Sequence, residues 1–351
     1  MFLFLINIKF GKIFNMKVLV TGGAGYIGSH TCVQLLERNH DVLVFDNFSN
    51  SSITVIDRIK MITGKTIKFI EGDITNYDKL SEVMSYFTPD AVIHFAGLKS
   101  VAESINDPLT YYEINVLGLL NTIRAMEFSN CRSIVFSSSA TVYGSSESLP
   151  FSEASPLNPE SPYGITKMIG EKLLKDWCFS QADAQAICLR YFNPVGAHSS
   201  GLIGEDPLTT PNNLMPFICQ VASGKKSQLL IYGNDYLTRD GTGERDYIHV
   251  MDLAEAHVKT VEQISKLEKF QLLNLGTGRG TTVLELVQAF EGASGREVPV
   301  KIVGRRAGDV AKSWAATSLV KSKLNFECNR SVFEMCRDAW HWQSKNPSGY
   351  D

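Results

Sequence analysis

Short apolar runs alternate with longer amphipathic stretches from Met16 onward. The runs are rich in Val, Ile and Phe and lack polar alternation, which is typical of strands buried on both faces of a sheet. Because strands that alternate with helices form parallel βαβ units, the pattern indicates a parallel sheet. We predict strands at 17–21, 41–45, 66–71, 91–95, 133–137 and 186–191, and helices near 27–38, 51–62, 77–87, 109–128 and 162–180.

The pattern changes after Phe192, where loops rich in Gly, Pro and Asn follow. Further helices are predicted near 212–223, 251–265, 282–293 and 331–343. The fold class is therefore α/β. We expect a Rossmann-type doubly wound parallel sheet over residues 16–192 and a smaller C-terminal α/β substrate lobe over 193–351, some segments of which return to the first domain. Such a lobe closes over the carboxyl ends of the strands, where open α/β folds bind ligands.

The first fifteen residues precede this pattern. Their apolar run, Met1 to Ile6, is shorter than the ~20 residues that cross a bilayer. It also lacks the basic start and the cleavage site of a signal peptide. We expect residues 1–15 to lie outside the fold, as the product of a start codon assigned too early or as a loose tail.

Charge and cysteine usage narrow the class of protein. The chain carries 34 Lys and Arg against 37 Asp and Glu, a net charge of −3. This balance argues against non-specific nucleic-acid binding and against a polybasic membrane patch. Seven cysteines without a CxxC pair fit a reducing, cytoplasmic compartment. The histidines show no HxxxH or HExxH spacing, so no metal site is predicted.

A glycine motif between the first strand and the first helix indicates a dinucleotide site. Gly22 permits a tight turn, Gly25 lets the backbone approach a pyrophosphate, and Gly28 lets helix and strand pack closely. The positive helix N-terminus then meets the phosphate charge. Asp46 ends the second strand and is suited to accept hydrogen bonds from a ribose diol while repelling a 2′-phosphate. The motif predicts NAD, with a purely structural turn as the alternative.

The segments after the third and fourth strands are further cofactor candidates. We expect them to flank adenine, to line the cofactor and to approach a phosphate or ribose; they are Asp73, Ile74, Phe95, Ala96, Gly97 and Lys99.

Tyr163 and Lys167 lie four residues apart and share one face of a predicted helix. A free Tyr titrates near pH 10, but Lys167 together with a positive nicotinamide ring would lower its pKa. Tyr163 would then take a proton from a substrate hydroxyl while hydride leaves the same carbon for NAD. Ser139 would position that hydroxyl; the alternative for Ser139 is a helix cap or a hydrogen bond at the strand end.

A longer series of motifs carries a family resemblance. In chain order they are GGAGYIGSH, DNFSN, EGDI, HFAGLKSV, FSSSATVYG, SPYGITK, LRYFNPVGAH, PNNLMP, GTGERDYIHVMDLA, NLGTG and WHWQ. Together they resemble the UDP-glucose 4-epimerase family of extended short-chain dehydrogenases/reductases, from Met16 to Asp351. The resemblance implies reversible conversion of UDP-glucose and UDP-galactose through a 4-keto sugar, with bound NAD. It also implies a homodimer paired through the helices near 109–128 and 162–180.

The resemblance further implies a set of site residues. The catalytic set is Tyr163, Lys167 and Ser139. The cofactor positions add Tyr26, Ile27, Asn47 and Phe192 to those above, with Tyr163 and Lys167. The substrate positions are Ser139, Tyr163, Asn193, Asn213, Leu230, Ile231, Tyr232, Arg245, Arg306 and Asp309. Arg245 and Arg306 are suited to clamp a diphosphate, and Asp309 to take ribose hydroxyls. A sugar that must present both faces cannot be tightly gripped, so affinity is expected from the nucleotide.

Two positions depart from some relatives. This chain has Ile114-Asn115-Val116 at the place where those relatives have Asn-Asn-Val. The cofactor candidate in this segment is therefore Asn115. Ser313 stands where some have a large Tyr beside the sugar. The small side chain predicts room for an N-acetyl group, and hence acceptance of UDP-N-acetylglucosamine and UDP-N-acetylgalactosamine.

Two other functions share part of this pattern. A nucleotide-sugar 4,6-dehydratase has the same fold, cofactor and YxxxK pair, but eliminating water needs further acid/base groups. Ala140 and Thr141 follow Ser139 here, and neither side chain ionises. A non-catalytic dinucleotide sensor would keep the glycine motif but typically loses the Tyr or the Lys, and this chain keeps both.

Overall fold

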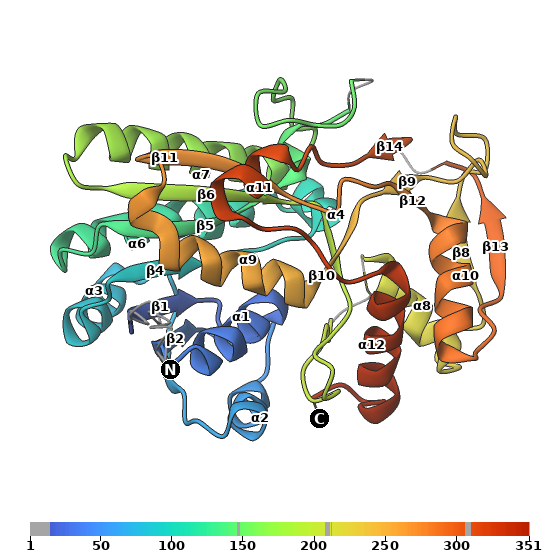
Figure 1. Ribbon diagram of the computed structural model, residues 1–351, viewed down its shortest axis with the longest axis horizontal. Helices are drawn as coiled ribbons and strands as arrows, with labels where there is room; N and C mark the ends of the chain where they lie inside the picture. The colour runs from blue at the N-terminus through green and yellow to red at the C-terminus, as the bar shows by residue number, and fades with distance from the viewer. Residues whose placement is uncertain (1–14, 146–147, 208–210, 212, 306–309, 351) are drawn as a thin grey trace, which may run out of the picture.

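A seven-stranded parallel sheet forms the centre of the protein (Figure 1). The computed structural model describes residues 15–145, 148–207, 211, 213–305 and 310–350. The strand order is β11-β6-β5-β4-β1-β2-β3. The strands are β1 (Lys17–Thr21), β2 (Asp41–Asp46), β3 (Lys68–Glu71), β4 (Ala91–His94), β5 (Ser133–Ser139), β6 (Gln185–Tyr191) and β11 (Phe270–Leu275). The order reverses between β1 and β4, and this switch point is where doubly wound sheets bind dinucleotides.

Helices cover both faces of the sheet, so the Rossmann-type prediction is confirmed. On one face, α1 (Tyr26–Glu37), α2 (Thr54–Thr63), α9 (Val250–Gln263) and α11 (Ser318–Leu324) bury one apolar core. On the other, α3 (Tyr77–Phe87), α6 (Gly118–Phe128) and α7 (Pro162–Ser180) bury a second core. The Val- and Ile-rich strands lie between these cores, which explains their lack of polar alternation.

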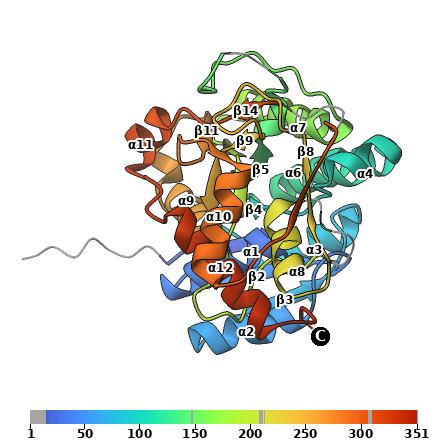
Figure 2. The ribbon, with the colours of Figure 1, turned by 90° about the vertical axis from the view of Figure 1, so that its right-hand side faces the viewer.

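The remaining elements build a smaller lobe beside the carboxyl ends of the strands (Figures 1 and 2). Its core lies among α8 (Leu214–Ala222), α10 (Val283–Ser294) and α12 (Val332–Lys345). Its small sheets are β8 (Leu229–Tyr232) with β13 (Val300–Val303), β7 (Asn193–Val195) with β10 (Tyr247–His249), and β9 (Glu244–Arg245) between β12 (Thr281–Thr282) and β14 (Lys312–Ser313). Figure 2 looks onto this lobe, with α10 and α12 toward the viewer.

Several boundaries differ from the prediction. The third strand begins at Lys68 instead of residue 66, and β11 is a seventh strand that the periodicity did not predict. The helix expected at 109–128 is composed of α5 (Pro108–Tyr112), a π-helix η1 (Glu113–Leu117) and α6. Short helices complete the chain: α4 (Val101–Asn106), η2 (Ala140–Val142) and η3 (Ile264–Lys266).

No helix within the described ranges combines the length and the apolar character needed to cross a membrane.

Candidate active site

The glycine loop forms a cradle at the start of α1. Gly22 has φ of +70°, and a Cβ there would lie 2.5 Å from the backbone nitrogen of Ala96. A Cβ at Gly28 would lie 2.3 Å from the carbonyl oxygen of Gly22, whereas one at Gly25 would come no closer than 3.3 Å to it. Gly25 is the N-cap of α1, and no side chain caps the helix. The first-turn N–H groups thus face an open position that suits a pyrophosphate.

The residues at the end of β2 fit the ribose and adenine end of a dinucleotide. Asp46 is buried, and its carboxylate accepts hydrogen bonds from the backbone N–H of Ala24 and of Phe48, both at 2.9 Å. Asn47 donates from Nδ2 to Asp73 at 2.7 Å. Burial opposes ionisation of Asp73, but hydrogen bonds from Thr75 and Asn47 outweigh it and lower the pKa of this carboxyl. The set holds acceptors in place for ribose hydroxyls, as NAD requires.

The loop after β4 crosses the end of β1. The N–H groups of Phe95 and Ala96 donate to the carbonyl oxygen of Thr21 at 2.9 and 3.1 Å. Lys99 forms an ion pair with Glu205 at 2.9 Å, and Asn213 donates to the same Glu205 oxygen at 2.7 Å. Glu205 therefore connects a predicted cofactor residue to a predicted substrate residue.

Asn115 is placed by the π-helix. Its Oδ1 accepts from the backbone N–H of Leu98 at 2.8 Å, and its Nδ2 donates to the Leu98 carbonyl and to Thr166 Oγ1, both at 3.0 Å. A Cβ at Gly97 would lie 2.9 Å from Asn115 Oδ1. The amide thus ties the loop after β4 to α7. A direct contact of Asn115 with the cofactor stays a prediction.

The other predicted cofactor residues surround the same edge. Tyr26 donates from its hydroxyl to the carbonyl oxygen of Gly196 at 2.6 Å. Ile27 and Ile74 pack against the two cores of the sheet, and Phe192 belongs to a separate apolar cluster. Their contacts with a bound cofactor stay predictions.

Ser139, Tyr163 and Lys167 come together at the carboxyl end of β5. The N-cap Ser161 and the first-turn proline start α7 just before Tyr163. Ser139 lies beside Tyr163 and lowers the pKa of its phenol, and Lys167 Nζ lies 5.8 Å from the centre of the Tyr163 ring. Ser139 also accepts from Thr141 N at 3.2 Å and caps η2. The alternative interpretation of Ser139 as a helix cap is therefore observed, and its role in positioning the substrate hydroxyl stays a prediction.

Burial determines the protonation of Tyr163 and Lys167 in the protein without a cofactor. Burial raises the pKa of Tyr163, and the hydrogen bond from Ser139 offsets only part of that effect. Burial also lowers the pKa of Lys167 to about 8 and, with the charge of Lys167, that of His94 to about 3. This desolvation opposes the lowering of the Tyr163 pKa that is expected from the neighbouring positive charges alone. Tyr163 therefore needs a further positive charge beside it before it can act as a base near neutral pH.

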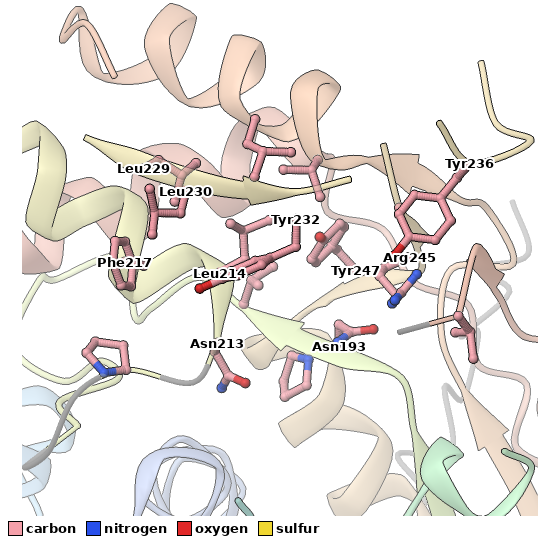
Figure 3. Close-up of a pocket in the computed structure, with 17 residues that line it drawn as sticks. Asn193, Asn213, Leu214, Phe217, Leu229, Leu230, Tyr232, Tyr236, Arg245 and Tyr247 are labelled. Carbon is pink, nitrogen blue, oxygen red and sulfur yellow. The ribbon is translucent and has the colours of Figure 1, made fainter. Parts of the chain in front are cut away.

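A cavity of about 380 Å³ lies in the smaller lobe. Six of the predicted substrate residues line it: Asn193, Asn213, Leu230, Ile231, Tyr232 and Arg245. Figure 3 shows the amides of Asn193 and Asn213 across the cavity from the strand that carries Leu230 and Tyr232. Ser313 pairs with Arg245 between β14 and β9. Arg306 and Asp309 lie outside the described residues, and the substrate roles of the whole set stay predictions.

Sequence reasoning missed several lining residues. Leu214 and Tyr247 line the cavity and lie inside the PNNLMP and RDYIHV motifs, which could have indicated them. Phe217 and Tyr236 also line it, and nothing in the local sequence marks them. The Tyr236 hydroxyl is buried without a hydrogen-bond partner among the described residues, and Arg305 lies over its ring at 4.2 Å.

The sheet, the cradle and the Ser–Tyr–Lys group define a dinucleotide-dependent enzyme that acts at a hydroxyl-bearing carbon. Residues 18–276 match the NAD dependent epimerase/dehydratase family, and the chain belongs to this family.

Named relatives are similar over nearly the whole chain. The chain is 51% identical to a UDP-glucose 4-epimerase of Bacillus subtilis, over 95% of this chain and 99% of the relative. A solved UDP-glucose-4-epimerase from Stenotrophomonas maltophila, with bound NAD and formylated UDP-arabinopyranose, is 47% identical with a TM-score of 0.93, covering 95% of this chain and 99% of the other. The Bifidobacterium longum enzyme in complex with NAD+ and UDP is 43% identical with a TM-score of 0.91, with coverage of 95% and 99%.

Proposed function

We propose that this chain is a UDP-glucose 4-epimerase, an isomerase that reversibly converts UDP-glucose and UDP-galactose at carbon 4 of the sugar. The observation that carries the proposal is the grouping of Ser139, Tyr163 and Lys167 at the carboxyl end of β5, beside the smaller lobe that contains the cavity. The similarity to enzymes of this name over 95% of the chain supports the same activity.

Each residue of the catalytic group has a separate role in the proposed reaction. NAD, when bound, would supply the acceptor and donor of hydride for carbon 4. Tyr163 takes the proton from the hydroxyl at carbon 4, while Ser139 holds that hydroxyl in place. Lys167 adds positive charge that favours the phenolate. After the 4-keto sugar turns over, Tyr163 returns the proton to the ketone oxygen as hydride reaches the opposite face.

The cavity suits a substrate that must turn during the reaction. Its walls include Leu230, Ile231 and Tyr232, and Arg245 supplies a cation for the diphosphate. These residues would hold the nucleotide and leave the sugar free to present either face. Affinity and turnover are thus assigned to different parts of the molecule.

Three finer points extend the proposal. The small Ser313 would admit N-acetylated UDP-sugars. A homodimer is supported by exposed apolar side chains on the expected helices, with Leu109, Phe128 and Phe179 each at least 68% exposed. A cytoplasmic location is supported by seven cysteines that are all free.

Incubation of the purified protein with UDP-galactose, without added NAD, tests the proposal. We expect UDP-glucose as the product. A 6-deoxy-4-keto sugar would indicate a dehydratase, and an unchanged substrate would indicate a dinucleotide sensor.

A further inference from the structure

A buried ion pair attaches the helix that carries Tyr163 and Lys167 to the sheet. Glu171 lies on α7 one turn after Lys167 and two turns after Tyr163, so all three share one helix face. Arg190 on β6 donates from Nε to Glu171 Oε1 at 2.8 Å and from Nη2 to Oε2 at 2.7 Å. The two residues are 1% and 4% exposed. The pair is therefore almost wholly removed from solvent.

Ser138 connects this ion pair to the strand of Ser139. Ser138 is the register partner of Arg190 between β5 and β6, and its hydroxyl donates to Glu171 Oε1 at 2.6 Å. One residue earlier, the carbonyl oxygen of Ser137 accepts from Lys167 Nζ at 2.8 Å. These contacts set the position of α7 along β5 at the level where Ser139 meets Tyr163.

The same guanidinium also holds the chain that follows Ser139. Its Nη1 donates to the Tyr143 hydroxyl at 2.9 Å and to the carbonyl oxygen of Glu153 at 3.3 Å. The Tyr143 hydroxyl in turn donates to Asn274 Oδ1 at 2.6 Å. Ser139 thus lies between two residues, Ser138 and Tyr143, that are bonded to one ion pair.

The segment after Tyr143 continues to the substrate lobe. Phe151 donates from its backbone nitrogen to the Trp314 carbonyl at 3.0 Å and accepts from Ala316 N at 2.7 Å. Trp314 directly follows Ser313, which pairs with Arg245 beside the cavity. Asn274 Nδ2 donates to the Phe151 carbonyl at 2.9 Å. Hydrogen bonds, joined by the peptide bond between Ser313 and Trp314, therefore connect the catalytic helix to the wall of the substrate cavity.

We propose that Arg190 and Glu171 are positioning residues, which hold the Ser139 hydroxyl in place beside Tyr163. This inference rests on the proposed function. A buried ion pair commonly adds no more stability than an apolar pair of the same volume, but its directional bonds allow only one placement of α7 against β5. The reaction depends on that placement, because displacement of a reacting group by about 1 Å can cost about 100-fold in rate.

Three variants test the inference, with Asp252→Asn as the matched control. Asp252 is a fully buried carboxylate whose ion-pair partner is Arg330, on another part of the fold. For Tyr143→Phe we expect kcat per folded molecule to fall about 10-fold, and for Arg190→Lys and Glu171→Gln about 100-fold. The KM for UDP-galactose and the bound-NAD absorbance should stay at parental values. Asp252→Asn should retain the parental kcat per folded molecule.

The inference would be overturned if Tyr143→Phe and every charge variant that folds kept the parental kcat per folded molecule. It would also be overturned if Asp252→Asn lost as much kcat as these variants. Tyr143→Phe keeps the ion pair, so it decides the question if the charge variants do not fold. A parent without turnover would refute the proposed function instead. The inference is then tested by the titration of the Tyr163 phenol. This titration is obtained by subtracting the signal of the same protein that also carries Tyr163→Phe. Displacement of Ser139 from Tyr163 should raise the pKa of Tyr163 in the three variants, and an unchanged titration would refute the positioning role.

Discussion

The Lys167 ammonium lies 5.8 Å from the centre of the Tyr163 ring and is anchored to the carbonyl oxygen of Ser137 at 2.8 Å. Lys167 is buried and Tyr163 is half-buried, and burial lowers the pKa of Lys167 while it raises that of Tyr163. The phenol therefore stays protonated in the protein alone. A positive nicotinamide ring beside it would provide the additional charge that favours the phenolate, so base strength is expected to depend on the bound cofactor.

Replacement of Tyr163 by Phe removes the proposed base and little else. We expect kcat to fall by about 10²–10⁴-fold, the range that general acid–base catalysis contributes. UDP affinity should be unchanged, because the residues proposed to hold the nucleotide line a separate cavity. Steady-state kinetics with UDP-galactose and calorimetric titration with UDP measure the two quantities. A parental kcat would remove Tyr163 from the mechanism.

Replacement of Lys167 by Met should alter the pH dependence of stability. The folded-state pKa of Lys167 is about 8, against 10.5 for a free Lys. Below about pH 8 Lys167 is protonated in both the folded and the unfolded protein, and the full free-energy cost of burying its ammonium group is present. Above it the unfolded chain binds more protons, so stability rises with pH by up to about 1.4 kcal/mol per pH unit. Lys167→Met lacks this contribution.

Urea unfolding without added nucleotide, at about pH 7.5 and about pH 9.5, checks this sign. The variant should exceed the parent in stability at the lower pH, and the difference should shrink at the higher pH. A difference that is constant across this range would show that the ammonium is not desolvated in the folded protein.

Two alanine substitutions separate the structural glycine from the ligand-facing one. A Cβ at Gly28 would meet backbone at 2.3 Å, whereas one at Gly25 would lie 3.3 Å from the carbonyl oxygen of Gly22. Gly28→Ala should therefore destabilise the fold by about 1–3 kcal/mol or more. Gly25→Ala should fold normally but lose bound NAD. Thermal unfolding and the absorbance of bound nucleotide distinguish the two, and full NAD content in Gly25→Ala would argue against the cradle.

We expect the substrate range to depend on the size of residue 313. The parent should convert both UDP-galactose and UDP-N-acetylgalactosamine, and Ser313→Tyr should lose only the second activity. A coupled assay with each sugar measures this. A parent that turns over UDP-galactose normally but not the N-acetylated sugar would refute the hypothesis.

Much of the fold follows from local patterns, since strands β1, β2, β4, β5 and β6 coincide with apolar runs that helices separate. Strand β11 was missed because Phe270–Leu275 pairs with β6, about 80 residues earlier in the chain, and periodicity carries no information on such distant pairing. The π-helix at Glu113–Leu117 was missed because the insertion of one residue into a helix is too local a change for the apolar pattern to report.

The chemistry of the site could be predicted from the sequence only for residues that lie in a recognisable motif. The grouping of Ser139, Tyr163 and Lys167 follows from their places on β5 and α7. Their protonation does not, because desolvation of Tyr163 comes from residues packed around it in three dimensions. The ion pair of Arg190 and Glu171 was missed for a similar reason, since each charge taken alone in the sequence suggests a solvated surface group.

The proposed mechanism requires that hydride leaves and re-enters carbon 4 of the same sugar while Tyr163 moves the proton. The decisive measurement is the conversion of UDP-galactose that carries deuterium at carbon 4, in ordinary water. We expect UDP-glucose that retains the deuterium at carbon 4. Loss of the label to solvent would refute this mechanism.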